Sequence, residues 1–122
     1  MAKLLAAIIL LVAASQALAH HSWPVDSSRE VTVRGTVTGI DWRDPHPSFD
    51  LDVKTDAGTV EKWKVGGPAL NRMEANGWTK STLKVGDVIT AVGHRFNDGS
   101  PVLRTQKITM ADGKEMRLYA RR

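Results

Sequence analysis

The residues of this sequence that are best suited to chemistry are its four histidines. They are His20, His21, His46 and His94. A neutral imidazole nitrogen is a common ligand for copper and zinc in proteins. The chain has no cysteine, which excludes disulfides, thiolate nucleophiles and cysteine-based zinc or iron–sulfur sites.

The first 19 residues predict a secretory signal peptide. Lys3 supplies a positive charge, the 11 residues from Leu4 to Ala14 are all apolar, and Ala17 and Ala19 suit an A-x-A cleavage site. The apolar run is shorter than the roughly 20 residues that a membrane-spanning helix needs. We therefore expect cleavage, a periplasmic location for the domain of residues 20–122, and no stable membrane span.

Cleavage after Ala19 would make His20 the first residue of the mature protein. The α-amino nitrogen and the ring of a terminal histidine can chelate one metal ion together, and a second histidine can complete a three-nitrogen site. His46 follows Pro45 and precedes Pro47, so it lies in a stiff loop that can hold a ligand in place. The sequence predicts a metal site that includes His20, His21 and His46, with His94 as a weaker candidate.

Copper is the preferred metal for this predicted site. An all-nitrogen terminal site suits Cu(II), and the order of divalent-metal affinities favours copper over zinc. Zinc would want a fourth ligand, which Asp44 could supply. The opposing interpretation remains open, because a histidine pair at a chain end is usually solvated, and the sequence does not bring His46 near His20.

Other polar groups give no catalytic signature. Asp50 and Asp52 alternate with apolar residues, which predicts a solvated outer strand face rather than a catalytic pair. No serine lies in a G-x-S-x-G context, and Gly66-Gly67 lacks the pattern of a phosphate-binding loop. The sequence assigns no catalytic residue, and an enzyme is the least favoured class of function.

The charge pattern argues against a nucleic-acid partner. The formal net charge is +4 over 122 residues, and removal of Lys3 with the signal peptide lowers it to +3. Lysines and arginines are scattered among acidic residues, whereas nucleic-acid binders usually gather them on one face.

The elements that must position these groups are mostly strands. Apolar residues alternate with polar ones in several segments that are separated by glycine, proline or Asx turns. The predicted strands cover residues 30–42, 49–54, 59–65, 88–96 and 102–110, with a short final strand within 114–119 and one helix over 68–76. A helix between the third and fourth strands is the order of an OB-fold. We predict a mainly β domain, a small five- to six-stranded OB-like barrel, with an open β-sandwich as the alternative.

Four tryptophans support a second hypothesis for function. We expect Trp63 and Trp78 in the core and Trp23 over one end of the barrel, while Trp42 is left open as a stacking platform. The alternative function is a metal-free adaptor module, in which the barrel face near Trp42 and His46 binds a glycan, a peptide or a periplasmic protein partner.

Several motifs resemble one family. They are Ala19-His-His-Ser22, the strand Val31–Val37, Trp42-Arg-Asp-Pro-His46, Gly66-Gly-Pro68, Gly77-Trp-Thr79 and Leu83-Lys-Val-Gly-Asp87. Together they resemble a family of small exported bacterial proteins catalogued as domain of unknown function 6152. The family typically has phenylalanine at the position of Trp23 and asparagine at that of Asp44. The resemblance implies an exported, OB-like barrel in which His20, His21 and His46 are the matching positions, and it implies no activity.

Overall fold

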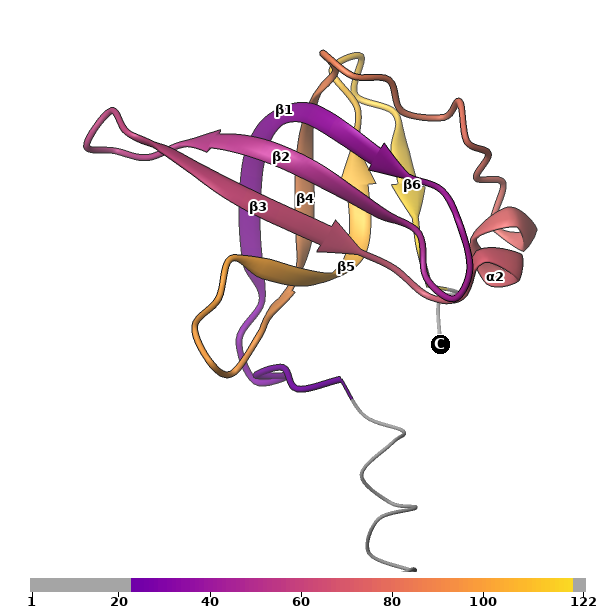
Figure 1. Ribbon diagram of the computed structural model, residues 1–122, viewed down its shortest axis with the longest axis horizontal. Helices are drawn as coiled ribbons and strands as arrows, with labels where there is room; N and C mark the ends of the chain where they lie inside the picture. Colours follow the sequence, from indigo (N-terminus) through magenta and orange to yellow (C-terminus); the bar gives the residue numbers. More distant parts are fainter. Residues whose placement is uncertain (1–22, 120–122) are drawn as a thin grey trace, which may run out of the picture.

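The computed structural model describes residues 23–119 of the chain. Its strands and single helix follow the predicted order closely (Figure 1). They are β1 (Val31–Asp41), β2 (Ser48–Lys54), β3 (Val60–Gly66), α2 (Leu70–Ala75), β4 (Val88–Arg95), β5 (Val102–Thr109) and β6 (Glu115–Arg117). The predicted fold class is confirmed, with the helix between β3 and β4. Across residues 23–119, the helix is too short and too polar to cross a membrane.

The sheet closes on itself through one parallel pairing. Its strand order is β3-β2-β1-β4-β5-β6, and β3 also pairs with β5, which joins the two sides into a five-stranded barrel. Residues 64–66 of β3 lie beside residues 102–104 of β5 in this pairing. The last strand, β6, is an additional strand beside the far end of β5.

The first strand, β1, bends sharply because its two halves pair with different strands. Figure 1 shows it as an arched ribbon. It pairs with β4 through residues 31–36 and with β2 through residues 36–41. A Cβ atom on Gly35 would lie 2.5 Å from the Asp52 carbonyl oxygen, so only glycine fits at this corner. Near Gly39 the β1–β2 register shifts, which marks a β-bulge. Gly35 and Gly39 therefore lie where β1 bends and where its register shifts.

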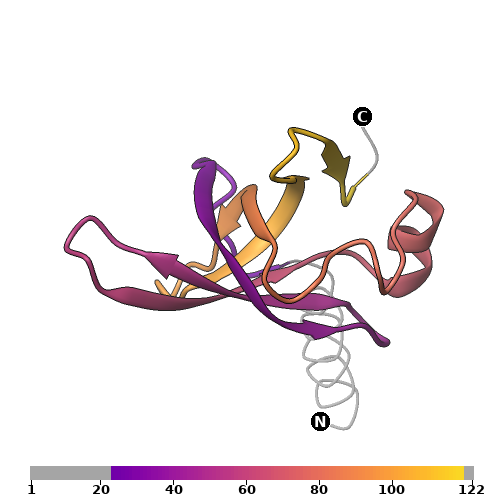
Figure 2. The same ribbon diagram turned by 90° about the horizontal axis from the view of Figure 1, so that it is seen from above.

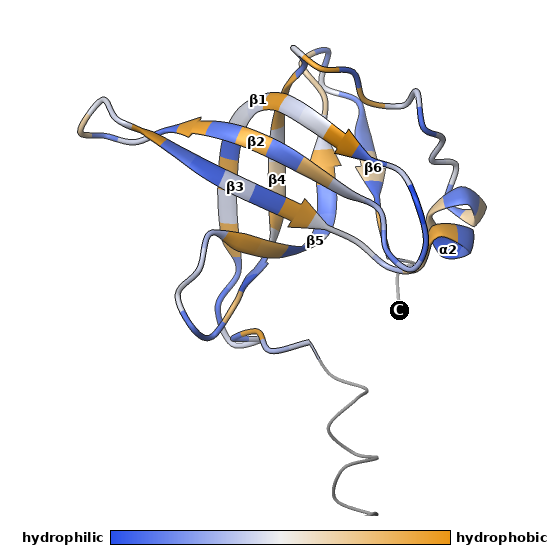
Figure 3. Ribbon diagram, viewed as in Figure 1, coloured by the Kyte–Doolittle hydropathy of each residue, from blue (hydrophilic) through white to orange (hydrophobic). Residues whose placement is uncertain are grey.

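The core lies inside the barrel and extends under its α2 end. Apolar and polar residues alternate along the strands, visible as stripes in Figure 3. Trp63 and Trp78 are buried, as predicted, and Trp78 lies against Phe49. The Trp78 indole N–H donates to the Arg117 carbonyl oxygen at 2.8 Å, which ties the loop after α2 to β6. Figure 2 shows α2 at the opposite side of the molecule from the tip of the β2–β3 hairpin.

Candidate functional site

The β1–β2 loop places His46 at the surface. His46 is exposed, and it stands between two prolines. The Pro47 residue is buried, and its carbonyl oxygen accepts a hydrogen bond from the Gly67 N–H at 3.4 Å. Because Gly67 directly follows β3, this bond holds the His46 loop against the end of that strand.

Trp23 lies directly against His46. The two ring centroids are 5.6 Å apart in an edge-to-face arrangement. The same indole meets Phe96 with centroids 6.0 Å apart, and it covers Gly66, where a Cβ atom would lie 3.6 Å from Trp23 Cη2. Aromatic edge-to-face pairs of this kind stabilise one defined placement of the rings. The Trp23 side chain therefore contacts three separate parts of the chain. These contacts hold it beside His46, and Trp23 follows His20 by three residues in the sequence.

The segment of residues 23–29, which we call the N-terminal arm, runs along the end of β4. Its Pro24 carbonyl oxygen accepts from the Asn97 N–H at 2.7 Å, and the Asp26 N–H donates to the Arg95 carbonyl oxygen at 3.2 Å. Between them, Val25 forms a β-bridge with Phe96. These contacts fix the path of the arm, and Trp23 at its start lies beside His46.

A local turn follows within the arm. The Asp26 carboxylate accepts hydrogen bonds from the Ser28 hydroxyl and the Ser28 backbone N–H. These two bonds, with a smaller contribution from the charge of Arg29, lower the pKa of Asp26 below its usual value. The ionised carboxylate is the form that stabilises the turn.

His94 contacts the arm rather than a cluster of ligands. Its Nδ1 lies 2.8 Å from the Arg29 carbonyl oxygen. Since a carbonyl oxygen only accepts hydrogen bonds, Nδ1 carries the proton, and Nε2 is the unprotonated nitrogen of the neutral ring. Of the two described histidines, His46 therefore meets Trp23 and His94 meets Arg29.

Residues 23–119 alone do not make a metal site. Across this part of the chain, no group of three histidine, aspartate or glutamate side chains could hold a metal ion. His20 and His21 lie outside the described residues, so their predicted part in a site stays a prediction. Asp44 is exposed in the same loop as His46.

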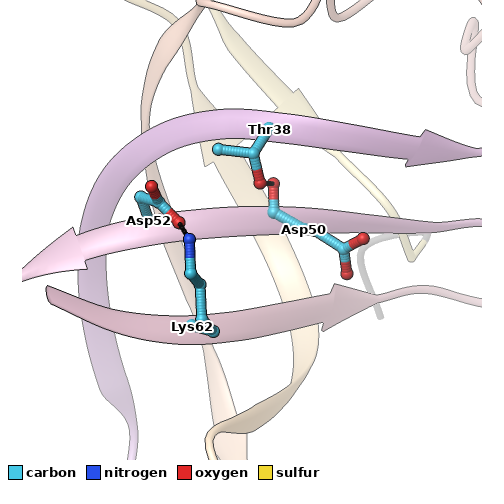
Figure 4. A network of polar contacts seen from close by, with 4 residues as sticks. All are labelled: Thr38, Asp50, Asp52 and Lys62. Atoms are coloured by element: carbon cyan, nitrogen blue, oxygen red, sulfur yellow. Dashed lines mark hydrogen bonds and ion pairs between the residues drawn. The ribbon is translucent and has the colours of Figure 1, made fainter.

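The outer face of β1, β2 and β3 carries paired charges. Lys62 Nζ lies 2.6 Å from Asp52 Oδ1, and Lys64 Nζ lies 3.7 Å from Asp50 Oδ1. Figure 4 shows the first pair, together with the Thr38 hydroxyl that donates to the Asp50 carbonyl oxygen. The predicted solvated face is confirmed.

Trp42 does not stand free as a stacking platform. It is partly buried and packs against the hydrophobic core. A groove of about 860 Å³ lies elsewhere, between the loop after α2 and the β5–β6 turn. Its rim alternates in charge, and no histidine is among its lining residues.

The contact between Trp23 and His46 is the feature that the sequence did not reveal. The one signal in the sequence was the Trp23-Pro24 pair just after the two terminal histidines. A large apolar ring at this position is expected to pack against the protein surface. The sequence could not identify that surface, because the β1–β2 loop, β3 and the β4–β5 loop form it together.

Comparison with known proteins places the chain in a family and supports its fold. The model of the Family of unknown function (DUF6152) matches residues 7–103. None of the curated proteins matches the sequence.

Two solved structures show the same fold at low identity. The mitochondrial single-stranded DNA-binding protein Rim1 from S. cerevisiae superposes with a TM-score of 0.53 and 7% identity, covering 68% of this chain and 93% of that one. The complex of TiaS with a transfer RNA and ATP has a TM-score of 0.52 and 18% identity, covering 74% of this chain and 20% of the other. Both likenesses concern the fold alone.

Proposed function

This chain belongs to the family of unknown function DUF6152, and from its own residues we propose that it is an exported protein that binds one copper ion through His20, His21 and His46. The observation that carries the proposal is the edge-to-face contact of Trp23 with His46, at 5.6 Å between centroids. Three residues of extended chain span at most about 11 Å. A histidine at position 20 is therefore within reach of the His46 ring.

The ligands follow from the chemistry of a terminal histidine. After cleavage behind Ala19, the free α-amine and the ring of His20 would chelate the metal together. His46, which is exposed and held by its loop, would supply a further nitrogen, and His21 offers another. Cu(II) accepts such a tetragonal nitrogen set readily, whereas zinc prefers a tetrahedral set that would need Asp44.

The first experiment tests export and metal retention together. The full chain is produced with its own leader, the exported form is purified, and its intact mass is measured with and without one equivalent of Cu(II). We expect a mass that begins at His20 and retains one copper ion through gentle desalting. A mass that begins elsewhere, or the loss of all copper, would contradict the terminal chelate.

Variants then assign the ligands. We expect His20→Ala to weaken Cu(II) binding by more than about tenfold, equivalent to about 1.4 kcal/mol, and His46→Ala to weaken it as well. A third form, acetylated at the α-amino nitrogen of His20, keeps both terminal rings and removes only the α-amine ligand, and we expect it to bind Cu(II) more weakly as well. Unchanged affinity in all three forms would leave the metal-free adaptor as the better hypothesis.

A further inference from the structure

We propose that His94 is a positioning residue and not a metal ligand, and that its Nδ1–H fastens the N-terminal arm to the barrel so that Trp23 stays beside His46. The fastening itself is a property of the metal-free protein. Its effect on copper affinity rests on the function proposed above.

The hydrogen bond of His94 acts on a part of the arm that has little else to hold it. Ser27, Ser28 and Arg29 are all exposed. Their remaining hydrogen bonds run within the arm, from Ser28 and Arg29 back to Asp26. Within residues 23–119, the His94 ring is the one side chain of the barrel that hydrogen-bonds to this stretch, at 2.8 Å from the Arg29 carbonyl oxygen.

The two ends of the N-terminal arm are fixed to different parts of the barrel. At one end Trp23 packs on Gly66, Phe96 and His46. At the other end His94, on β4, holds Arg29 just before β1 begins. Because a segment fixed at both ends loses conformational freedom before any ligand binds, binding at its tip costs less ordering entropy.

Two substitutions at His94 can separate this role from metal ligation. Nδ1 donates to the carbonyl oxygen, so ligation by His94 would have to use Nε2. An asparagine amide nitrogen occupies nearly the position of Nδ1 and donates in the same way, but it has no counterpart of Nε2. His94→Asn therefore preserves the proposed bond and removes the potential ligand, whereas His94→Ala removes both.

The first measurement is amide hydrogen exchange of the metal-free protein, read at the Asp26 and Asn97 N–H groups that join the arm to the barrel. We expect His94→Ala to accelerate their exchange by about tenfold, the effect of one lost hydrogen bond. His94→Asn should leave their exchange within about twofold of wild type. Equal exchange in His94→Ala and wild type would overturn the fastening role.

The second measurement is Cu(II) affinity of the exported form by competition with a chelator. We expect His94→Ala to weaken binding by about threefold to tenfold, while His94→Asn binds like wild type. If both variants weaken binding equally, Nε2 is a ligand and the proposal is wrong. If wild type binds no copper, the proposed function fails, and the exchange experiment still decides whether His94 fastens the arm.

Discussion

Replacement of Gly93 by alanine should destabilise the barrel strongly, and the structure gives the reason. Gly93 directly precedes His94 on β4, where the β4–β5 register shifts. A Cβ atom at this position would lie 2.1 Å from the Arg104 carbonyl oxygen. The obstacle is backbone of the neighbouring strand rather than the end of a flexible side chain, so β4 and β5 must separate.

The size of the effect follows from that displacement. Overpacking a well-packed interior usually costs about 1–3 kcal/mol, and a clash with backbone belongs at the upper end of that range. We therefore expect Gly93→Ala to lower the free energy of unfolding by about 3 kcal/mol, with a fall in Tm of about 12 °C or more for a domain of this size. Separation of the strands would also move His94 away from the Arg29 carbonyl oxygen.

The assay is equilibrium unfolding in urea, followed by tryptophan fluorescence. Gly66→Ala is the matched control, because Gly66 is also a buried strand glycine but a Cβ atom there would meet its nearest neighbour at 3.6 Å, an ordinary contact. The control should change the free energy of unfolding by less than about 1 kcal/mol. If Gly93→Ala is as stable as Gly66→Ala, the reasoning from strand separation is refuted.

Three further outcomes are expected. Burial raises the pKa of Tyr119, against the opposing charge of Arg104, so ultraviolet titration of this single tyrosine should show a midpoint above 10. Stability should correspondingly fall as the pH rises beyond the value of about 10 at which the unfolded chain ionises, and a midpoint at or below 10 would contradict the burial argument. Trp78→Phe should cost about 2–3 kcal/mol in urea unfolding, since it leaves the Arg117 carbonyl oxygen without its donor; a loss under about 0.5 kcal/mol would show that this bond contributes little. Lys62→Gln should change stability by no more than about 0.5 kcal/mol, because the side chain is 78% exposed in its ion pair. A larger loss would mean that the outer face contributes more than its exposure suggests.

Local patterns in the sequence were sufficient for the elements and for the class of fold. The alternation of Val31, Val33 and Val37 with polar residues identifies a strand with one buried face, because side chains of a strand point to opposite sides in turn. Gly35 and Gly39 interrupt this alternation, and a glycine inside a strand often marks a bulge or a bend. The helix between the third and fourth strands then favoured the barrel.

The candidate site depends on contacts that no local pattern encodes. His46 belongs to the β1–β2 loop and Trp23 to the arm before β1, and they meet at the end of β3 beside Phe96. The sequence could name the histidines as ligand types, but their neighbours depend on how the barrel closes.

His94 illustrates the same division between sequence and tertiary structure. Its sequence position predicted a strand and left open whether its ring faced a metal, solvent or the protein. The answer came from the Arg29 carbonyl oxygen, a backbone atom 65 residues away that any residue type at that position would present. Because a backbone acceptor leaves no trace in residue type, the partner of His94 was decided by the tertiary structure alone.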